Sequence, residues 1–288
     1  MSFNQPKIDT HIHTEGTAPY KKGDSNLKPY HKRGREKGLE IMCITDHYHY
    51  ITQDPRYLFN QRKHIDEMKY SGPAVLLGTE QTILGKRGRL AIRRNTRSIL
   101  DMINISIHWF GVGMPGLFWG TTFGTQDLKK ISKYVRDDSE KANKLFRFIS
   151  DSYVNALQSK KIEKIPTILG HPWDNFLARG LFFKNILEET RRIVKIVRET
   201  NAAFEFNDGT CAQLINYMYS SNDDAIDFLV ELVGILNDHE VWISFASDAH
   251  QISDIGNLEH AKRLLIEIGK KTSTKSLKMV NSEFLNLS

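Results

Sequence analysis

Residues 7–13 read KIDTHIH, a short run of mostly apolar and β-branched residues that ends in two histidines. Such a run is typical of a strand, and residues two apart on a strand point to the same side. Six more runs share this character, at residues 40–46, 74–80, 103–108, 165–171, 202–207 and 241–248. Their near-continuous apolar character predicts strands buried on both faces, as in a parallel sheet.

Stretches with helical spacing of apolar residues alternate with these runs. The expected helices cover residues 29–37, 60–70, 126–159, 187–199, 223–236 and 257–269. Strands alternating with helices predict an α/β fold, and seven such strands favour a closed or nearly closed barrel over an open sheet. We expect one domain over residues 1–288 with a helical insertion around 110–160. Its Gly-rich and aromatic part, 110–124, is either a loop over a site or a packed surface loop.

Composition excludes several classes of protein. The 288 residues are 40% hydrophobic and 26% charged, which argues against disorder, collagen and a disulfide scaffold. No apolar run approaches the roughly 20 residues that span a bilayer, and the start of the chain does not read as a secretory signal. Cys43 and Cys211 are therefore expected to be reduced, buried thiols of a cytoplasmic protein. The net charge of +6 is compatible with an anionic substrate or weak nucleic-acid contact.

Six of the seven expected strands finish with side chains of the types that bind metals. In a parallel α/β barrel all strand C-termini lie on one face, so these side chains should converge. The candidate ligands are His11, His13, Asp46, His47, Glu80, His108, His171, Asp248 and His250. Imidazole with carboxylate suits Zn²⁺, Mn²⁺ or Fe. Nine candidates exceed the roughly four to six positions around one ion, so two or three divalent ions are expected. We expect His49 to line the site and the other histidines, His31, His64, His239 and His260, to be solvated.

Closely spaced ions serve one reaction particularly well. A carboxylate such as Glu80 has two oxygens and can bridge two ions. Such a pair lowers the pKa of bound water and clamps the attacking and leaving oxygens of an in-line displacement. The pattern therefore indicates phosphoester hydrolysis.

The motifs DTHIHT, ITDH, GTE, SIH, GHP and SDAH, in this order, resemble the PHP family, named for polymerase and histidinol phosphatase domains. The resemblance runs from about residue 7 to residue 270 and implies a distorted, TIM-like (β/α)7 barrel with a trinuclear site. It implies a first ion held by His11, His13, Glu80 and Asp248, a second by Glu80, His108 and His171, and a third by His47 and His250. Family members with three ions usually add a histidine or aspartate from the loop after the first motif. That loop has no histidine here, and Glu15 and Asp24 are its candidate ligands.

The resemblance implies a metal-dependent phosphatase acting on the phosphomonoester of a small metabolite, by attack of a hydroxide that bridges two ions. Asp46, either a ligand or an acid that orients His47, and His250 would assist the leaving alkoxide as catalytic residues. Arg179 is a candidate for binding the phosphate, as is Lys22. The basic run 86–97 either approaches the substrate or is solvated charge.

Three alternatives remain open from the sequence. A nuclease or oligonucleotide phosphodiesterase would use a basic, aromatic groove, and Trp109 and Trp119 follow His108 closely. An amidohydrolase-like enzyme would need a lysine ligand at a strand end, and none stands at the expected ends. A non-catalytic scaffold would show broken ligand motifs, whereas all six are intact. Oligomeric state cannot be read from the sequence.

Overall fold

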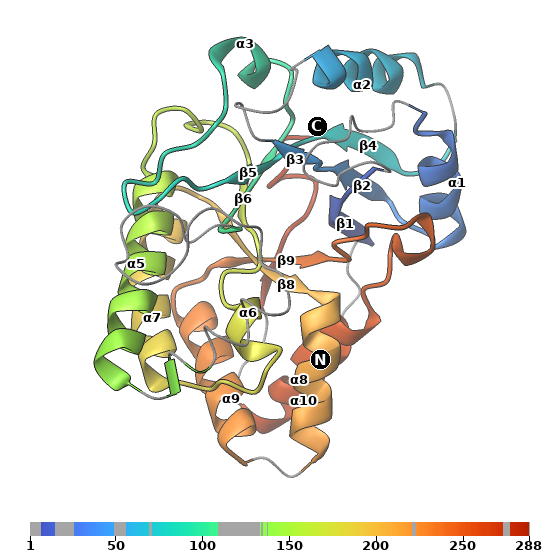
Figure 1. Ribbon diagram of the computed structural model, residues 1–288. Coiled ribbons are helices and arrows are strands. Elements are labelled where there is room, and N and C mark those ends of the chain that lie inside the picture. Colours follow the sequence, from blue (N-terminus) through green and yellow to red (C-terminus); the bar gives the residue numbers. More distant parts are fainter. Residues whose placement is uncertain are drawn as a thin grey trace.

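The computed structural model describes residues 7–14, 26–48, 56–68, 71–108, 133, 135–136, 138–220, 223–272 and 277–287 (Figure 1). All paired strands in this part of the chain run parallel. They are β1 (Ile8–Ile12), β2 (Ile41–Ile44), β3 (His47–Tyr48), β4 (Ala74–Leu77), β5 (Glu80–Thr82), β6 (Ile103–Ser106), β7 (Thr167–Leu169), β8 (Ala203–Asn207), β9 (Trp242–Ala246) and β10 (Lys278–Met279).

The strands follow one another around a barrel in chain order. One sheet has the order β1-β2-β4, and the other has the order β10-β9-β8-β7-β6-β5-β3. Only two residues separate β2 from β3, and two separate β4 from β5, so each pair corresponds to one expected strand. The first and last members meet where Ile12 bridges Ala249 and His13 N donates to Ala249 O at 2.9 Å. The expected α/β barrel of seven parallel strands is confirmed, and β10 is an unexpected addition beside β9.

A buried carboxylate fastens this closure. Asp9, in β1, accepts from the backbone N–H groups of Ser247 at 3.0 Å and Gly256 at 2.9 Å, both in the segment after β9. Burial raises the pKa of Asp9 to about 6, although these hydrogen bonds oppose the rise. The seam that brings His11 and His13 beside Asp248 is therefore held by hydrogen bonds as well as by strand pairing.

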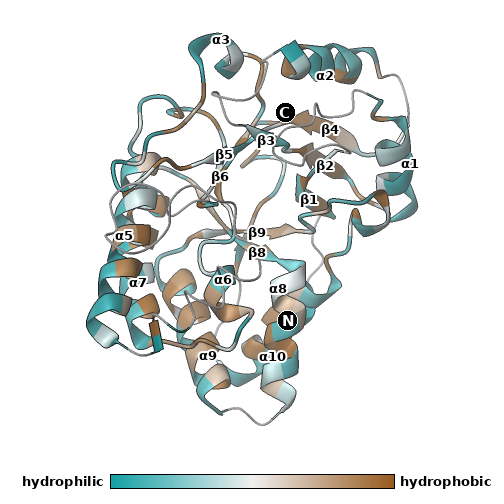
Figure 2. Cartoon of the chain, in the orientation of Figure 1, coloured by the Kyte–Doolittle hydropathy of each residue, from teal (hydrophilic) through white to brown (hydrophobic). Residues whose placement is uncertain are grey.

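Helices pack on the outside of the strands (Figure 1). They are α1 (Lys28–Glu36), α2 (Arg56–Glu67), α3 (Arg94–Arg97), α5 (Ser139–Leu157), α6 (Asp174–Leu177), α7 (Lys184–Glu199), α8 (Asp208–Tyr219), α9 (Asp223–Asp238) and α10 (Glu259–Lys271), with a 3₁₀ turn, η1 (Ile252–Asp254). The largest core joins the strands to α5, α7, α9 and α10, and a second joins β2 and β4 to α1 and α2. Figure 2 shows apolar residues concentrated on β2, β4 and α9. No described helix is both long enough and apolar enough to cross a membrane.

The helix α8 is absent from the sequence-based expectation. Gly209 and Thr210 have low helix propensity, which hides the start of this helix. The structure begins it with a cap, because the side chain of Asn207 accepts from Thr210 N at 3.3 Å. Cys211, Leu214 and Ile215 then form its buried face. A short apolar stripe was thus enough to form a helix here, because the end of β8 supplies the residue that caps its start.

Other expectations have mixed outcomes. Of the expected helix 126–159, the structure describes α5, whereas the segment 110–124 lies outside the described residues. The domain boundaries stay a prediction. Cys43 and Cys211 are free and buried, as expected.

The prediction for one histidine is wrong. His31 was expected in solvent, but it is buried on the inner side of α1. It packs so close to Gly72 that a Cβ there would lie 2.8 Å from His31 Cε1. His64 and His260 are exposed, as expected, and His239 is half-buried with Nδ1 donating to Ile235 O at 2.9 Å.

Candidate metal centre

Glu80 lies at the centre of the barrel mouth, fully buried at the start of β5. Its Oε1 lies 3.0 Å from Nε2 of both His108 and His171. Its Oε2 lies 2.6 Å from Nδ1 of His47. The two oxygens of one carboxylate therefore face two different groups of imidazoles, which is the arrangement of a bridging ligand.

A second acid faces the paired histidines of β1. His11 and His13 are both fully buried, and their ring centroids lie 4.8 Å apart. Asp248 Oδ1 lies 3.0 Å from His13 Nε2 and 3.6 Å from His11 Nε2. Glu80 Oε2 lies 3.6 Å from His11 Nε2 and 3.7 Å from His13 Nε2. As the spacing HxH predicted, both rings point to the same side and share one pair of carboxylates.

These side chains form four overlapping groups whose candidate ligand atoms lie within 4.8 Å of one another. The groups are His11, His13 and Asp248; His47, Glu80 and His108; His13, His47 and His250; and His11, His171 and Glu205. Eight of the nine residues singled out in the sequence are in this set. They come from six of the seven barrel strands or the turns after them, so the barrel brings together residues up to 239 positions apart (11 to 250).

The donor atoms in this cluster fit divalent cations. Among the described residues, His11 Nε2 is buried and has no hydrogen-bond partner, although oxygens of Glu80 and Asp248 each lie 3.6 Å away. Buried polar atoms are normally satisfied, so such atoms need a partner that a protein group does not supply. Imidazole nitrogen and carboxylate oxygen are the ligands of Zn²⁺, Mn²⁺ and Fe, and no described cysteine belongs to the set.

Charge in the cluster agrees with this fit. Burial opposes ionisation of Glu80, but His108, His47 and His11 hold the pKa of its carboxyl well below the ordinary range. Burial likewise opposes protonation of His171, yet the hydrogen bond and charge of Glu80 raise its pKa to about 10. The carboxylates thus attract positive charge strongly. A divalent cation is the form of positive charge that several such groups can share at once.

Burial lowers the pKa of two histidines of the cluster, His108 and His13. Burial, followed by the proximity of His47, lowers the pKa of His13 to about 3. Its imidazole is therefore neutral at physiological pH, which is the state in which histidine coordinates a metal ion.

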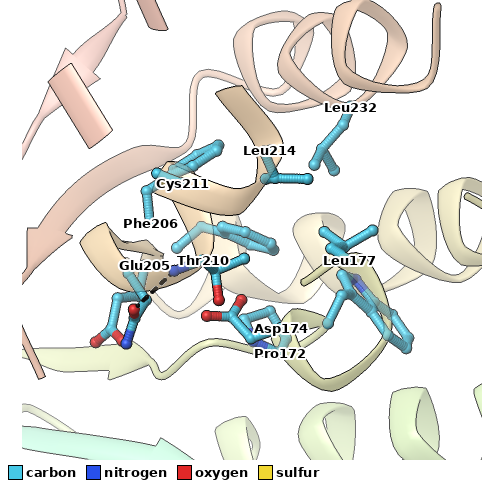
Figure 3. A pocket seen from close by; sticks show the side chains of 12 residues that line it. Pro172, Asp174, Leu177, Glu205, Phe206, Thr210, Cys211, Leu214 and Leu232 are labelled. Atoms are coloured by element: carbon cyan, nitrogen blue, oxygen red, sulfur yellow. Dashed lines mark hydrogen bonds between the residues drawn. The ribbon is translucent and has the colours of Figure 1, made fainter. Parts of the chain in front are cut away.

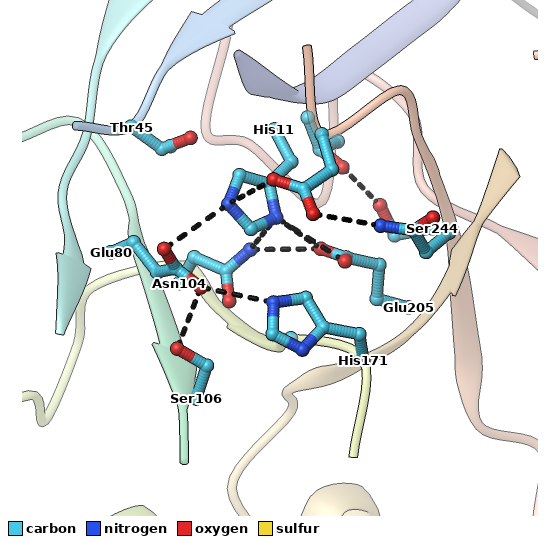
Figure 4. Close-up of polar contacts among 12 residues, drawn as sticks. His11, Thr45, Glu80, Asn104, Ser106, His171, Glu205 and Ser244 are labelled. Carbon is cyan, nitrogen blue, oxygen red and sulfur yellow. Dashed lines mark hydrogen bonds and ion pairs between the residues drawn. The ribbon is translucent and has the colours of Figure 1, made fainter. Parts of the chain in front are cut away.

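A polar layer that the sequence analysis missed holds the ligands in place (Figure 4). His11 Nδ1 lies 3.1 and 3.2 Å from the two carboxylate oxygens of Glu205. Asn104 Nδ2 donates to Glu205 Oε2 at 2.8 Å and lies 2.8 Å from His11 Nδ1. With its proton on Nδ1, His11 donates to Glu205, and its Nε2 is then the nitrogen that offers a lone pair to the centre. The sequence feature that could have revealed Glu205 is a charged residue between Phe204 and Phe206 in an expected buried strand.

Three more side chains contact candidate ligands. Ser106 Oγ donates to Glu80 Oε1 at 2.6 Å. Asn207 Nδ2 donates to Asp248 Oδ2 at 3.0 Å. Thr82 Oγ1 lies 3.1 Å from His108 Nδ1. These contacts fix the rotamers of two carboxylates and one imidazole before any ion binds.

Two of the candidate ligands have a left-handed backbone conformation. His171 has φ 30° and Asp248 has φ 51°, conformations that cost a non-glycine residue about 1 kcal/mol or more. Both residues follow a barrel strand directly or closely, where the chain turns toward the helices. The turns aim these side chains back over the barrel mouth.

A small cavity lies behind Glu205 (Figure 3). It measures about 20 Å³, enough for one water molecule, and Asp174, Thr210 and Cys211 line it together with Glu205. Burial raises the pKa of Asp174 to about 7, and its Oδ2 has no hydrogen-bond partner among the described residues. The Asp174 carboxyl is therefore a buried acid that lines the same cavity as Glu205, next to the cluster.

The remaining expected site residues lie in different surroundings. Asp46 Oδ1 accepts from Thr14 N at 2.7 Å, and its Oδ2 accepts from Thr14 Oγ1 at 2.6 Å and from Gln61 Nε2 at 2.8 Å. His250 is half-exposed with its ring centroid 4.3 Å from that of His13. Arg179 donates to Asn175 O at 2.7 Å, and burial lowers the pKa of its guanidinium.

Several other candidates lie outside the described residues. These are Glu15, Lys22, Asp24, His49, Trp109 and Trp119.

Comparison with known proteins agrees with this geometry. A protein from Vibrio parahaemolyticus named "Probable phosphatase VPA1527" is 26% identical over 286 residues, which cover 98% of this chain and 93% of that protein. A protein from Vibrio campbellii named "Probable phosphatase" is 25% identical to this chain. A protein from Caldanaerobacter subterraneus named "Probable phosphatase TTE1963" is 23% identical. They cover 93% and 91% of this chain, and 86% and 83% of their own length is matched. The family model of the PHP domain matches residues 9–209, from the first strand to the start of α8. The chain therefore belongs to the PHP domain family.

Proposed function

We propose that this protein is a metal-dependent phosphatase that hydrolyses the phosphomonoester of a small metabolite. The single observation that carries the proposal is the Glu80 carboxylate, whose two oxygens face separate sets of imidazoles at the barrel mouth. The relatives named as phosphatases, which match nearly the whole chain, support the same reaction class.

The ligand sets follow from the distances. His11, His13 and Asp248 with Glu80 Oε2 would hold one ion, and His108 and His171 with Glu80 Oε1 would hold a second. A third would lie by His13, His47 and His250. When bound, Zn²⁺, Mn²⁺ or Fe ions supply Lewis-acid polarisation of phosphoryl oxygens and lower the pKa of water.

The protein's own groups prepare the site for a phosphate. Glu205 and Asn104 hold the ring of His11, and Ser106 holds Glu80, so the centre is pre-organised. His250 Nδ1 lies 2.9 Å from the carbonyl oxygen of Asp248, which leaves Nε2 either to hold the third ion or, when the ring is an imidazolium, to give a proton to the leaving oxygen.

Asp46 would act indirectly. Both of its oxygens are engaged by Thr14 and Gln61, so we place it as a residue that positions the chain next to His47. Arg179 stays a prediction as a phosphate-binding residue. In the structure its guanidinium donates to the carbonyl oxygen of Asn175.

Turnover of p-nitrophenyl phosphate tests the proposal. We expect His11→Ala and Glu80→Ala each to abolish turnover and to reduce the bound metal measured by elemental analysis. A matched control is His64→Ala, which removes an exposed imidazole far along α2. Full activity in the first two variants would refute the assignment.

A screen of phosphorylated metabolites then identifies the substrate. Labelled single-stranded oligonucleotides form the comparison arm. Cleavage of oligonucleotides with no release of phosphate from small monoesters would replace the phosphatase by a nuclease. Cleavage of C–N bonds by an amidohydrolase-like site is disfavoured, since every partner of Glu80 in the described ion pairs is a histidine and none is a lysine.

A further inference from the structure

The basic run 86–97 frames a hollow of its own. Between β5 and β6 the chain makes a tight turn, in which Leu84 and Arg89 form an antiparallel bridge, instead of a long helix. This turn packs against the C-terminal end of α5 and borders an open pocket of about 570 Å³. None of the residues that line the pocket belongs to the metal centre. Its size lies within the range of small-molecule sites.

The two walls of this pocket are fastened to each other. Asn155 Nδ2 donates to Lys86 O at 2.8 Å, and Lys161 Nζ donates to Leu90 O at 2.9 Å. Gly88 has φ 63° and lies so close to α5 that a Cβ would be 2.2 Å from Ala156 N. The pocket is therefore preformed, and a ligand would not have to order it.

Its lining carries positive charge without acidic residues. Arg87, Arg89, Arg93 and Lys161 line it, and no aspartate or glutamate does. Arg87 and Arg89 are exposed and make no ion pair or side-chain hydrogen bond with any residue that the structure describes. The adjacent Lys86, by contrast, pairs with Asp151 at 3.2 Å. Two guanidinium groups beside one pocket offer planar, forked donors, which match the geometry of phosphate.

The pocket also has an apolar side. Leu84 lines it and is half-buried, and Leu90, Ala91 and Ile92 lie next to it with at most 4% of each residue exposed. A bare inorganic ion would leave this surface unused, whereas an organic phosphate would cover it. We propose that the pocket binds an organic polyphosphate of nucleotide size, with its phosphates at Arg87 and Arg89 and its ring against this apolar surface. This is a second ligand site, separate from the metal centre.

Fluorescence titration of the metal-loaded full chain with mant-labelled α,β-methylene-ADP tests the proposal. We expect saturable binding that is weakened about tenfold or more in the double variant Arg87→Ala with Arg89→Ala, since each loses charge-assisted hydrogen bonds. The control double variant, Lys63→Ala with Lys195→Ala, removes two exposed charges elsewhere and should bind within about twofold of the wild type. Unlabelled α,β-methylene-ADP should displace the probe, and adenosine should not.

Equal affinity in both double variants, no saturable binding to the wild type, or displacement by adenosine would overturn the proposal. Displacement by inorganic phosphate as efficient as by α,β-methylene-ADP would also overturn it, because the apolar surface would then have no role. Turnover of p-nitrophenyl phosphate by the Arg87/Arg89 variant should match that of the wild type, and its loss would place the run at the catalytic centre. The binding result stands even if the wild type proves inactive as a phosphatase.

Discussion

Glu205 shows how one residue can control a site without being part of the motifs that reveal it. It is fully buried in β8 and accepts from the Nδ1 side of His11, while Asn104 donates to the same carboxylate. A histidine that binds a metal through Nε2 is oriented by the group at its other nitrogen. The orientation of His11 thus depends on a strand whose sequence, AFEFN, contains no ligand motif.

Glu205→Gln tests this role at the residue scale. The amide keeps the shape of the side chain but removes the negative charge at His11 Nδ1. We expect metal affinity, measured by competition with a chelating dye, to fall about 10- to 100-fold. Circular dichroism should be unchanged, and Glu199→Gln, at an exposed position of α7, serves as the control. Wild-type metal affinity in Glu205→Gln would show that His11 is held by packing alone.

Asp174 provides a pH-dependent prediction. Because burial raises its pKa to about 7 from an ordinary value near 3.8, the folded state binds this proton more tightly than the unfolded state. The stability that the protonated carboxyl contributes is therefore present at low pH and lost as pH rises through about 7. We expect Asp174→Asn to gain free energy of unfolding relative to the wild type between pH 5 and pH 8. Urea unfolding of both proteins at the two pH values measures this, and a constant difference would contradict it.

At the scale of elements, the end of β7 is fitted closely to its neighbour. A Cβ at Gly170 would lie 2.2 Å from Asn104 Oδ1, and Asn104 belongs to the layer that holds Glu205. The strand can therefore bring His171 to the mouth only with glycine before it.

Two glycine substitutions test this fit. Gly170→Ala should lower the melting temperature and weaken metal binding, because Asn104 must move. Gly234→Ala is the matched control, since a Cβ there meets nothing within 4 Å and the residue lies inside α9. We expect Gly234→Ala to raise stability by about 0.5–1 kcal/mol with no change in metal content. Equal effects of the two substitutions on metal content would contradict this account.

At the scale of the whole molecule, metal binding and folding should be coupled. The ligands come from every part of the barrel and meet only when it closes, so the unfolded chain has no comparable site. Differential scanning calorimetry should show a lower melting temperature after treatment with a chelator, and recovery on addition of Zn²⁺ or Mn²⁺. Recovery should be lost in Glu80→Gln. A melting temperature that is insensitive to metal would mean that the cluster is not a metal site.

The sequence by itself determined the barrel and most of the centre. Near-continuous apolar runs mark buried parallel strands, and the parallel strands of a barrel place their C-termini on one face, so the ends of the motifs from His11 to His250 had to meet. The same reasoning could not find Glu205, Asn104 or α8, because their roles depend on which side chains oppose them across the barrel rather than on local pattern.

Only the tertiary structure decided which side-chain atoms of the site contact one another. It turned the two oxygens of Glu80 toward different imidazoles, engaged Asp46 with Thr14 and Gln61, and buried His31. The strands and the residue types at their ends follow from patterns that are local in the sequence. Rotamers and hydrogen-bond partners follow from packing between segments that are far apart in it.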